Sequence, residues 1–310
     1  MQILNALKQV KGISFELQFR LVPIEILTKL QQDMEKHRFS GPAGQFIEAH
    51  YMHYNFDVPS DFRSILVVSY PQPHAQVGIE IEGKNGVISG RGSGLKYVTM
   101  PSGYYNPSYA QRVHQEILKA LQVKGISAKP AHLPLKLLSA RCGLTQYGKN
   151  NISYVRPYGS QHRLVAFFTD LQAKVESDPW IESIHMEDCK QCNACVEACP
   201  YGALQIDNDL MNPNKCLSFY MDLMNPLPPW TTQAQVNAII GCTHCQDCCN
   251  LNHYFSVESR ETLAVISKAQ LDEIKAIDHY EDLSYSTKAL VYTLGFEDGY
   301  GLLKRNMEVL

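Results

Sequence analysis

The sequence predicts an α+β (or α/β) N-terminal domain, a small cysteine-rich domain and a short helical C-terminal segment. Over the first 178 residues, apolar residues at helical spacing alternate with short β-branched runs. Nine of the ten cysteines lie between Cys189 and Cys249, among short elements and proline breaks. From residue 256 onward the apolar spacing is again helical. We therefore expect domains at 1–178 and 179–255, and a helical extension at 256–310.

Four segments justify the N-terminal assignment. Residues 23–39 (PIEILTKLQQDMEKHRF) and 106–122 (NPSYAQRVHQEILKALQ) predict helices, the second with Pro107 in the first turn, where proline is tolerated. Residues 64–70 (SILVVSY) and 163–171 (RLVAFFTDL) predict buried strands. The pattern leaves the order of the strands open.

The cysteine-rich segment and the C-terminal segment are expected to be stabilised in different ways, the first by metal ligation and the second by apolar helix packing. Residues 179–255 hold few apolar runs and the break NPLPPW, so metal ligation has to replace much of an apolar core. Residues 263–277 (LAVISKAQLDEIKAI) and 300–310 (YGLLKRNMEVL) predict helices that cover the rest.

Composition narrows the class of protein. The 28 basic and 31 acidic residues give a formal net charge of -3, so no global basic field attracts nucleic acid or acidic lipid. No run of 18 apolar residues predicts a membrane span, and the N-terminal stretch lacks the features of a secretory signal. We expect a cytoplasmic protein whose cysteines bind metal and do not form disulfides.

The strongest signal is a run of four cysteines followed by proline. Cys189, Cys192, Cys195 and Cys199 have the spacing C-x2-C-x2-C-x3-C, and Pro200 follows. This run is typical of ferredoxin-like proteins with two 4Fe-4S clusters, in which the first three cysteines bind one cluster and the fourth binds the other. The run therefore predicts two clusters and a need for four more ligands.

The remaining ligands come from a less regular set. Cys216, Cys242, Cys245, Cys248 and Cys249 are the candidates, and spacing alone favours Cys248 over Cys249 as the last ligand of the first cluster. Two zinc ions are the alternative, because eight cysteines can form two tetrahedral sites. The compact run ending in proline favours 4Fe-4S clusters.

These stretches resemble the epoxyqueuosine reductase family and, more widely, the double-cluster proteins that include the catalytic part of cobalamin-dependent reductive dehalogenases. The resemblance rests on LPLKLLSARCGLTQYGKNN (133–151), YGSQHRLVAFFTDL (158–171), DCKQCNACVEACPYGAL (188–204), KCLSF (215–219) and GCTHCQDCCNLN (241–252). A weaker similarity surrounds SILVVSY. The matching stretches cover most of residues 40–255.

The resemblance implies an assignment of the cluster ligands. The family pattern G-C-x-x-C-Q-x-x-C-P-x-N fits Gly241 to Asn252, with Asn250 in place of proline, and it favours Cys249 over Cys248. One cluster then has the ligands Cys189, Cys192, Cys195 and Cys249. The other has Cys199, Cys216, Cys242 and Cys245. Cys248 becomes a spare thiol, packed as a small apolar side chain.

The resemblance also implies electron transfer to a substrate. Ferredoxin or flavodoxin supplies electrons, the clusters pass them to a cobalamin-type cofactor in the N-terminal domain, and a small-molecule substrate is reduced. The family's catalytic aspartate is missing, because Lys129, Pro130 and Ala131 stand in its segment. We therefore expect a substrate other than epoxyqueuosine. The short C-terminal segment leads us to expect no tRNA partner.

Single residues complete the prediction. In place of the missing acid we consider Tyr104, Tyr105 and His132 as proton donors, each weighed against a packing role. The turn formed by Gly148, Lys149 and Asn150 is the candidate cofactor contact, since it offers backbone donors and a charge. The alternative to a cobalamin-dependent reductase is an electron-carrier or redox-sensing protein with no corrinoid and no substrate.

Overall fold

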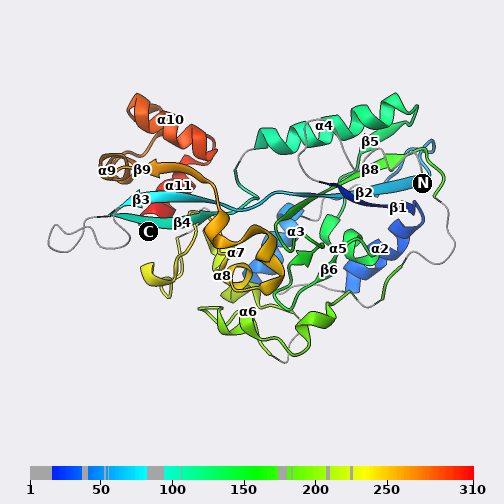
Figure 1. The fold of residues 1–310 in the computed structure, drawn as a ribbon, viewed down its shortest axis with the longest axis horizontal. Helices are drawn as coiled ribbons and strands as arrows, with labels where there is room; N and C mark the ends of the chain where they lie inside the picture. The colour runs from blue at the N-terminus through cyan, green and yellow to red at the C-terminus, as the bar shows by residue number, and fades with distance from the viewer. Residues whose placement is uncertain are drawn as a thin grey trace.

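A four-stranded sheet forms the centre of the N-terminal part of the computed structural model (Figure 1). The structure describes residues 16–36, 41–51, 54, 56–81, 94–105, 107–173, 180–182, 184–206, 210–223 and 226–310. The strand order is β1-β2-β8-β5, and every neighbouring pair is antiparallel. The strands are β1 (Gln18–Pro23), β2 (Ser64–Pro71), β5 (Ala128–Pro130) and β8 (His162–Thr169).

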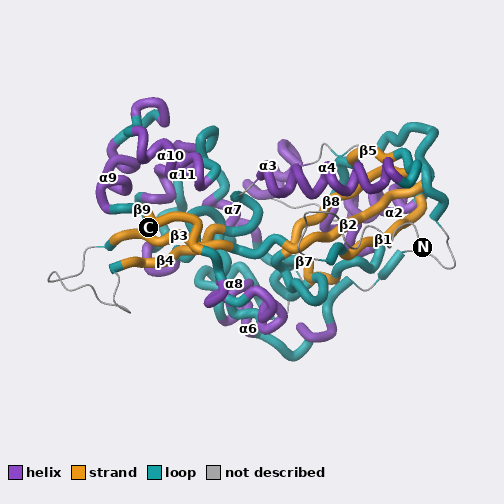
Figure 2. The backbone as a smooth tube through the Cα atoms, turned by 45° about the horizontal axis from the view of Figure 1, so that its top comes forward, coloured by secondary structure: helices purple, strands orange, loops and turns teal. Residues whose placement is uncertain are grey.

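Helices cover both faces of this sheet, which explains why β2 is buried along its whole length. One face packs on α4 (Pro107–Val123), where Leu66 and Val68 meet Ile117. The other packs on α2 (Ile26–Lys36) and α5 (Leu135–Arg141), where Ile65 and Val67 meet Leu30. Alternate side chains of β2 thus enter two different cores, as the period of a strand requires. Figure 2 shows α4 lying along the sheet.

The helices predicted within 23–39 and 106–122 and the strands predicted at 64–70 and 163–171 are confirmed as α2, α4, β2 and β8. Pro23 ends β1, and residues 37–39 and 106 lie outside the described residues. Pro107 is the first residue of α4. Three small elements complete this part: α3 (Gly41–Tyr51), β6 (Gln146–Tyr147) and β7 (Ser153–Tyr154).

A second sheet joins segments that are far apart in the sequence. Its order is β4-β3-β9, with β3 (Ala75–Glu80), β4 (Leu95–Met100) and β9 (Thr262–Ile266). The strand β9 pairs parallel with β3, so that Ile79 lies opposite Ile266. The helices α9 (Lys268–Ala276), α10 (Tyr285–Leu294) and α11 (Tyr300–Met307) share one apolar core with this sheet.

This sheet corrects one detail of the helical C-terminal segment. Residues 263–277 were expected to form a single helix, but Leu263 to Ile266 lie in a strand. Ser267 then starts α9: its side chain accepts the Gln270 N–H, and Gln270 reaches back to the backbone of Ser267. The β-branched run before a capping box was the signal for this division. The three predicted domains remain a prediction, and the β3–β9 pairing crosses their boundaries.

The cysteine-rich part lies between the two sheets and consists of short turns (Figures 1 and 2). Its helices are α6 (Ala194–Glu197), α7 (Leu217–Met221) and α8 (His244–Asp247). The helices α6 and α8 lie against each other. This arrangement brings the two cysteine-containing stretches together.

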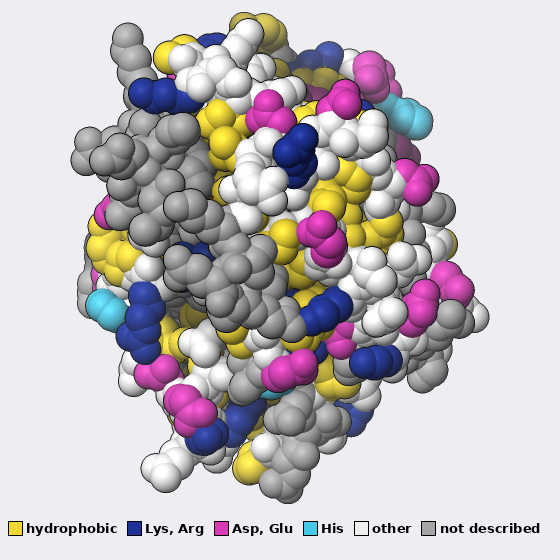
Figure 3. All heavy atoms as spheres, turned by 90° about the vertical axis from the view of Figure 1, so that its right-hand side faces the viewer, with side chains coloured by type: hydrophobic (Ala, Val, Ile, Leu, Met, Phe, Trp, Pro, Cys, Tyr) yellow, Lys and Arg dark blue, Asp and Glu magenta, His cyan; other side chains and the backbone are white. Residues whose placement is uncertain are grey.

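The surface charges and the helices of the structure agree with what the composition predicts. On the face drawn in Figure 3, basic and acidic side chains of the described residues are interspersed. Among the described residues, the helices are all too short or too polar to cross a bilayer.

Candidate metal centre

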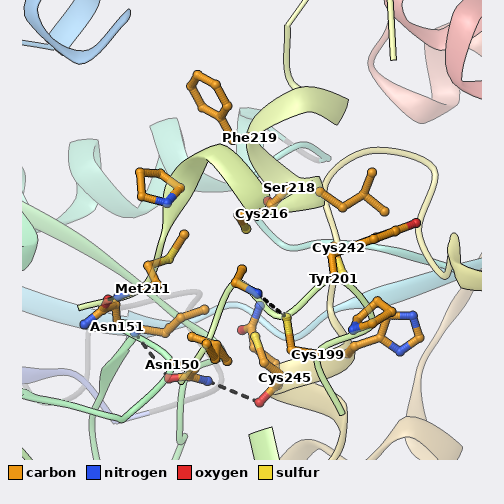
Figure 4. A pocket seen from close by; sticks show the side chains of 18 of the residues that line it. Asn150, Asn151, Cys199, Tyr201, Met211, Cys216, Ser218, Phe219, Cys242 and Cys245 are labelled. Atoms are coloured by element: carbon orange, nitrogen blue, oxygen red, sulfur yellow. Dashed lines mark hydrogen bonds between the residues drawn. The ribbon is translucent and has the colours of Figure 1, made fainter. Parts of the chain in front are cut away.

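Four of the predicted ligands line one cavity of about 330 Å³. Figure 4 shows Cys199, Cys216, Cys242 and Cys245 around a common space. These four cysteines follow α6, precede α7, precede α8 and lie within α8, respectively. The structure thus groups the thiols that the family resemblance assigned to the second cluster.

Burial and mutual proximity define the electrostatics of this group. Burial, with the neighbouring Cys216 and Cys199 thiols, raises the pKa of the Cys242 thiol to about 12. The pKa of Cys245 is raised by burial and by Cys242 and Cys216. The Ala203 N–H donates to Cys199 Sγ at 3.3 Å. Thiols that are this hard to ionise alone become thiolates when a metal centre replaces their protons.

The first ligand set also comes together. Burial raises the pKa of the Cys189 thiol, and Cys249 and Cys192 raise it further. Burial raises the pKa of Cys195 to about 11, with contributions from Cys248, Cys189, Cys192 and Cys249. The other four thiols of this stretch, including Cys248, therefore all lie within electrostatic reach of Cys195.

The backbone distinguishes Cys248 from Cys249. The residues before α6 and α8, Asn193 and Thr243, have φ/ψ of -118°/7° and -119°/4°. The residues after the two helices, Ala198 and Cys248, have -76°/-12° and -82°/-5°. The two turns share these backbone angles and the spacing C-x2-C-x3-C, which places Cys249 at the position of Cys199.

The sequence shows this internal repeat only in part, because the second stretch lacks the first cysteine and the final proline of the run at Cys189. Cys248 corresponds to Ala198, a residue that cannot bind metal. The geometry therefore favours Cys249 as a ligand and Cys248 as the spare thiol. The complete ligand assignment remains a prediction.

The turn at Gly148 supports the clusters in a way that the sequence did not indicate. A Cβ on Gly148 would lie 2.7 Å from Asn150 Oδ1 and from Tyr154 Cε2, so only glycine fits. Asn150 Nδ2 donates to Tyr154 Oη at 2.8 Å and to the Cys245 carbonyl at 3.2 Å. Lys149 Nζ donates to Asn193 Oδ1 at 2.9 Å. This turn therefore fixes the cysteine loops.

Sequence reasoning did not identify Tyr154. Its hydroxyl lies within hydrogen-bond reach of Cys249, and burial and this thiol raise the Tyr154 pKa. A neutral phenol beside a cluster sulfur can donate a hydrogen bond to it, and such bonds adjust cluster potentials.

An ion pair joins α8 to the second sheet. Arg260, with 5% of its side chain exposed, pairs with Asp247. Arg260 Nη1 also donates to Thr99 Oγ1 at 2.8 Å, and Thr243 Oγ1 donates to Asp247 at 2.8 Å. The pair thus holds the α8 turn against β4.

The proton-donor candidates lie in different places. The Tyr105 hydroxyl donates to the Pro73 carbonyl, and burial raises its pKa to about 12. The centre of the His132 ring lies 5.5 Å from that of the Tyr54 ring. His132 is not among the described residues that line the cavity. Tyr104 is within hydrogen-bond reach of Asp222, which lines the cavity. Of the three, Tyr104 alone connects to the cavity.

The thiol sets fit 4Fe-4S clusters. Each predicted set offers four sulfur atoms, and the Ala203 N–H donates to one of them, Cys199 Sγ. Among the described residues, no three His, Cys, Asp or Glu side chains converge tightly enough for a single metal ion. A cubane holds its thiolates further apart, around a larger group.

Comparison with known proteins agrees with this geometry. Residues 188–252 match the 4Fe-4S double cluster binding domain. The chain is 26% identical over 148 residues to an epoxyqueuosine reductase of Listeria monocytogenes, covering 48% of this chain and 37% of that enzyme. It is 30% identical over 118 residues to the Bacillus subtilis enzyme, covering 38% and 28%. The matched stretches thus span well under half of these relatives.

Solved structures extend the similarity to the whole fold. Epoxyqueuosine reductases from Bacillus subtilis and Streptococcus thermophilus superpose with TM-scores of 0.60 and 0.61, each covering 99% of this chain and 79% of the other, at 17% identity. Residues 188–252 thus have the sequence of a double 4Fe-4S cluster domain, in a fold like that of these enzymes. In sequence and fold the chain is epoxyqueuosine reductase-like, which confirms the resemblance.

These relatives correct the functional predictions. A substrate other than epoxyqueuosine was expected because one loop lacks an aspartate, but the sequence and structure relatives are epoxyqueuosine reductases. The electron-carrier alternative is likewise unsupported. The expectation of no tRNA partner is wrong, since one such reductase was solved with an epoxyqueuosine-modified tRNA stem loop. The loss of one side chain does not exclude the reaction, because another residue can supply the same proton.

Proposed function

We propose that this chain reduces epoxyqueuosine in tRNA and passes the electrons through two 4Fe-4S clusters. One observation carries the proposal: four predicted cluster ligands line an accessible cavity within a fold shared with epoxyqueuosine reductases over 99% of the chain. A cluster at the wall of a cavity can deliver electrons to a group bound there.

The chemistry matches the number of clusters. Removing an epoxide oxygen breaks two C–O bonds, forms one C=C bond and releases water, which consumes two electrons and two protons. Each 4Fe-4S cluster carries one electron at a time, so a fully reduced chain holds the two that are required. A low-potential one-electron reductant then restores the clusters.

A cobalamin-type cofactor is part of the proposal. When bound, it would supply a two-electron reductant next to the second cluster. Phe46, Met211 and Phe219 line the cavity beside the thiols, and their apolar side chains suit the face of a planar macrocycle. The role of the chain is to hold the reacting groups in this apolar space and to exclude water.

The test is anaerobic reconstitution with iron, sulfide and hydroxocobalamin, followed by incubation with dithionite and an epoxyqueuosine-containing tRNA stem loop. We expect about eight irons per chain, a retained corrinoid spectrum and conversion of the nucleoside to queuosine by mass spectrometry. Cys216→Ser serves as a control that should lose one cluster and the activity. A fully loaded wild type that leaves the epoxide intact would overturn the proposal.

A further inference from the structure

Opening an epoxide requires a proton for the departing oxygen, and the segment where the resemblance places an aspartate has none. Lys129 and Pro130 of this segment lie in β5, Ala131 and Leu133 are buried, and the His132 ring lies beside Tyr54. The solved Bacillus subtilis enzyme is described with a catalytic aspartate loop. None of the residues 129–132 lines the cavity beside the thiols, so this chain has to supply the proton from another residue.

The charged side chains that line the cavity offer one carboxyl group. Among the described lining residues these are Lys136, Asp222 and His244. Lys136 Nζ donates to the Asn151 carbonyl at 2.8 Å and lies 5.4 Å from the centre of the Tyr147 ring. His244 Nε2 lies 2.9 Å from the Gln235 carbonyl. Asp222 alone among the three is a carboxylic acid.

The surroundings of Asp222 suit a proton donor. It follows the last residue of α7, and its side chain remains accessible to solvent, so a substrate can reach it. Tyr104 comes from the loop before α4 and hydrogen-bonds to the carboxyl group. Arg305 of α11 lies nearby, but it donates to the Met221 carbonyl at 3.0 Å and to the Tyr220 carbonyl at 3.2 Å.

We propose that Asp222 is the general acid for the proposed reduction and that Tyr104 is its positioning residue. The protonated carboxyl gives its proton to the epoxide oxygen as the first C–O bond breaks. The two clusters that the predicted cysteine sets would hold would supply both electrons. Water supplies the second proton, and the oxygen leaves as water. Solvent then reprotonates Asp222.

The charge balance around Asp222 supports this role. The surrounding protein removes part of its hydration, which raises the pKa of Asp222, while the Tyr104 hydrogen bond and the Arg305 charge lower it. Arg305 also donates hydrogen bonds to the carbonyls of Tyr220 and Met221, so its guanidinium group is not directed at Asp222 alone. A raised pKa keeps more of the acid form near neutral pH, as general acid catalysis requires.

The inference rests on the proposed function, and its test compares variants of the fully reconstituted protein. Asp222→Asn should lower kcat by about 100-fold or more, with iron content and the dissociation constant for the stem loop unchanged. Asp222→Glu should restore part of the rate. Asp272→Asn, an exposed residue of α9, is the matched control and should behave as wild type.

Tyr104→Phe separates positioning from packing. Because the Tyr104 hydrogen bond lowers the pKa of Asp222, its loss should move the alkaline limb of the kcat profile to higher pH while stem-loop binding persists. A merely structural tyrosine would change stability and leave the limb in place.

The outcomes distinguish the two proposals. If wild type converts the stem loop and Asp222→Asn keeps both rate and pH profile, the role of Asp222 is refuted and the proposed function stands. Loss of the alkaline limb in Lys136→Met, with Asp222→Asn unaffected, would assign the proton to Lys136. A loaded but inactive wild type overturns both proposals.

Discussion

Cys248 and Cys249 are adjacent thiols whose roles depend on one backbone turn. Cys248 occupies the position that Ala198 has after α6, and Cys249 occupies that of Cys199. Both thiols raise the pKa of Cys195, so their distance from Cys195 does not decide which of them is the cluster ligand. The separation comes from the correspondence of the two turns.

Replacing each of these cysteines by serine therefore gives different results. We expect Cys248→Ser to keep both clusters and Cys249→Ser to lose one, because serine is a poor ligand for iron in a cubane. Iron content and the visible absorption of the anaerobically reconstituted variants measure this. Equal iron loss in the two variants, or loss confined to Cys248→Ser, would refute the correspondence.

His162 at the start of β8 is buried in a hydrogen-bonded structural environment. Its Nδ1 lies 2.9 Å from Ser69 Oγ, and its Nε2 lies 3.1 Å from the Ser153 carbonyl. Because a carbonyl only accepts, Nε2 carries the proton and Nδ1 accepts from the serine. Burial lowers the pKa of His162 to about 4, so the ring is neutral near pH 7.

This buried histidine predicts a loss of stability in acid. The unfolded chain binds a proton below its pKa of 6.5, whereas the folded chain does so only near 4. Stability is therefore complete above about pH 6.5 and falls as the pH drops toward 4, by up to about 3 kcal/mol for this group. Thermal unfolding midpoints of wild type and His162→Gln should converge over this range. The exposed His279→Gln is the control, and a parallel decline in all three proteins would contradict the prediction.

At the scale of elements, the α8 turn is held by a contact with the second sheet. Arg260 precedes β9 and pairs with Asp247 at the end of α8, while Thr99 of β4 accepts from the same guanidinium. The cluster loop and the C-terminal strand therefore depend on each other.

Breaking this pair should cost far more than breaking a surface pair. Arg260→Met leaves the Asp247 carboxylate without its partner, and we expect a loss of about 3 kcal/mol or more. Lys268→Met removes an exposed pair to Asp272 at 2.8 Å and should change stability by less than about 1 kcal/mol. Anaerobic urea unfolding compares the two variants. Equal midpoints would show that the buried pair contributes no more than the surface one.

At the scale of the whole molecule, the C-terminal segment completes a sheet that begins in the N-terminal part. β9 covers the free edge of β3, and α9, α10 and α11 share a core with it. The core includes Val77 and Ile79 of β3 and Met100 of β4, each at most 1% exposed. Leu217, Met221 and Ile239 of the cysteine-rich part belong to the same core, and the C-terminal helices supply most of its other apolar side chains.

A chain ending at Phe255 should therefore fail to fold stably. Removing residues 256–310 exposes this core and an unpaired strand edge, which favours aggregation. We expect an insoluble product with little bound iron. Co-expression of 256–310 as a separate fragment should restore solubility. A soluble truncated chain with both clusters would instead support the independent domains predicted from the sequence.

The sequence by itself determined the main helices and strands and the double-cluster motif. These features are local: periodicity, a proline in the first turn and C-x2-C spacing act within a few residues. Only the tertiary structure decided the strand orders, the strand at β9, the backbone correspondence of α6 and α8, and the placement of Asp222 beside the second ligand set. These depend on contacts between segments far apart in the chain, such as β3 with β9, and no local pattern records which distant partner a segment will meet.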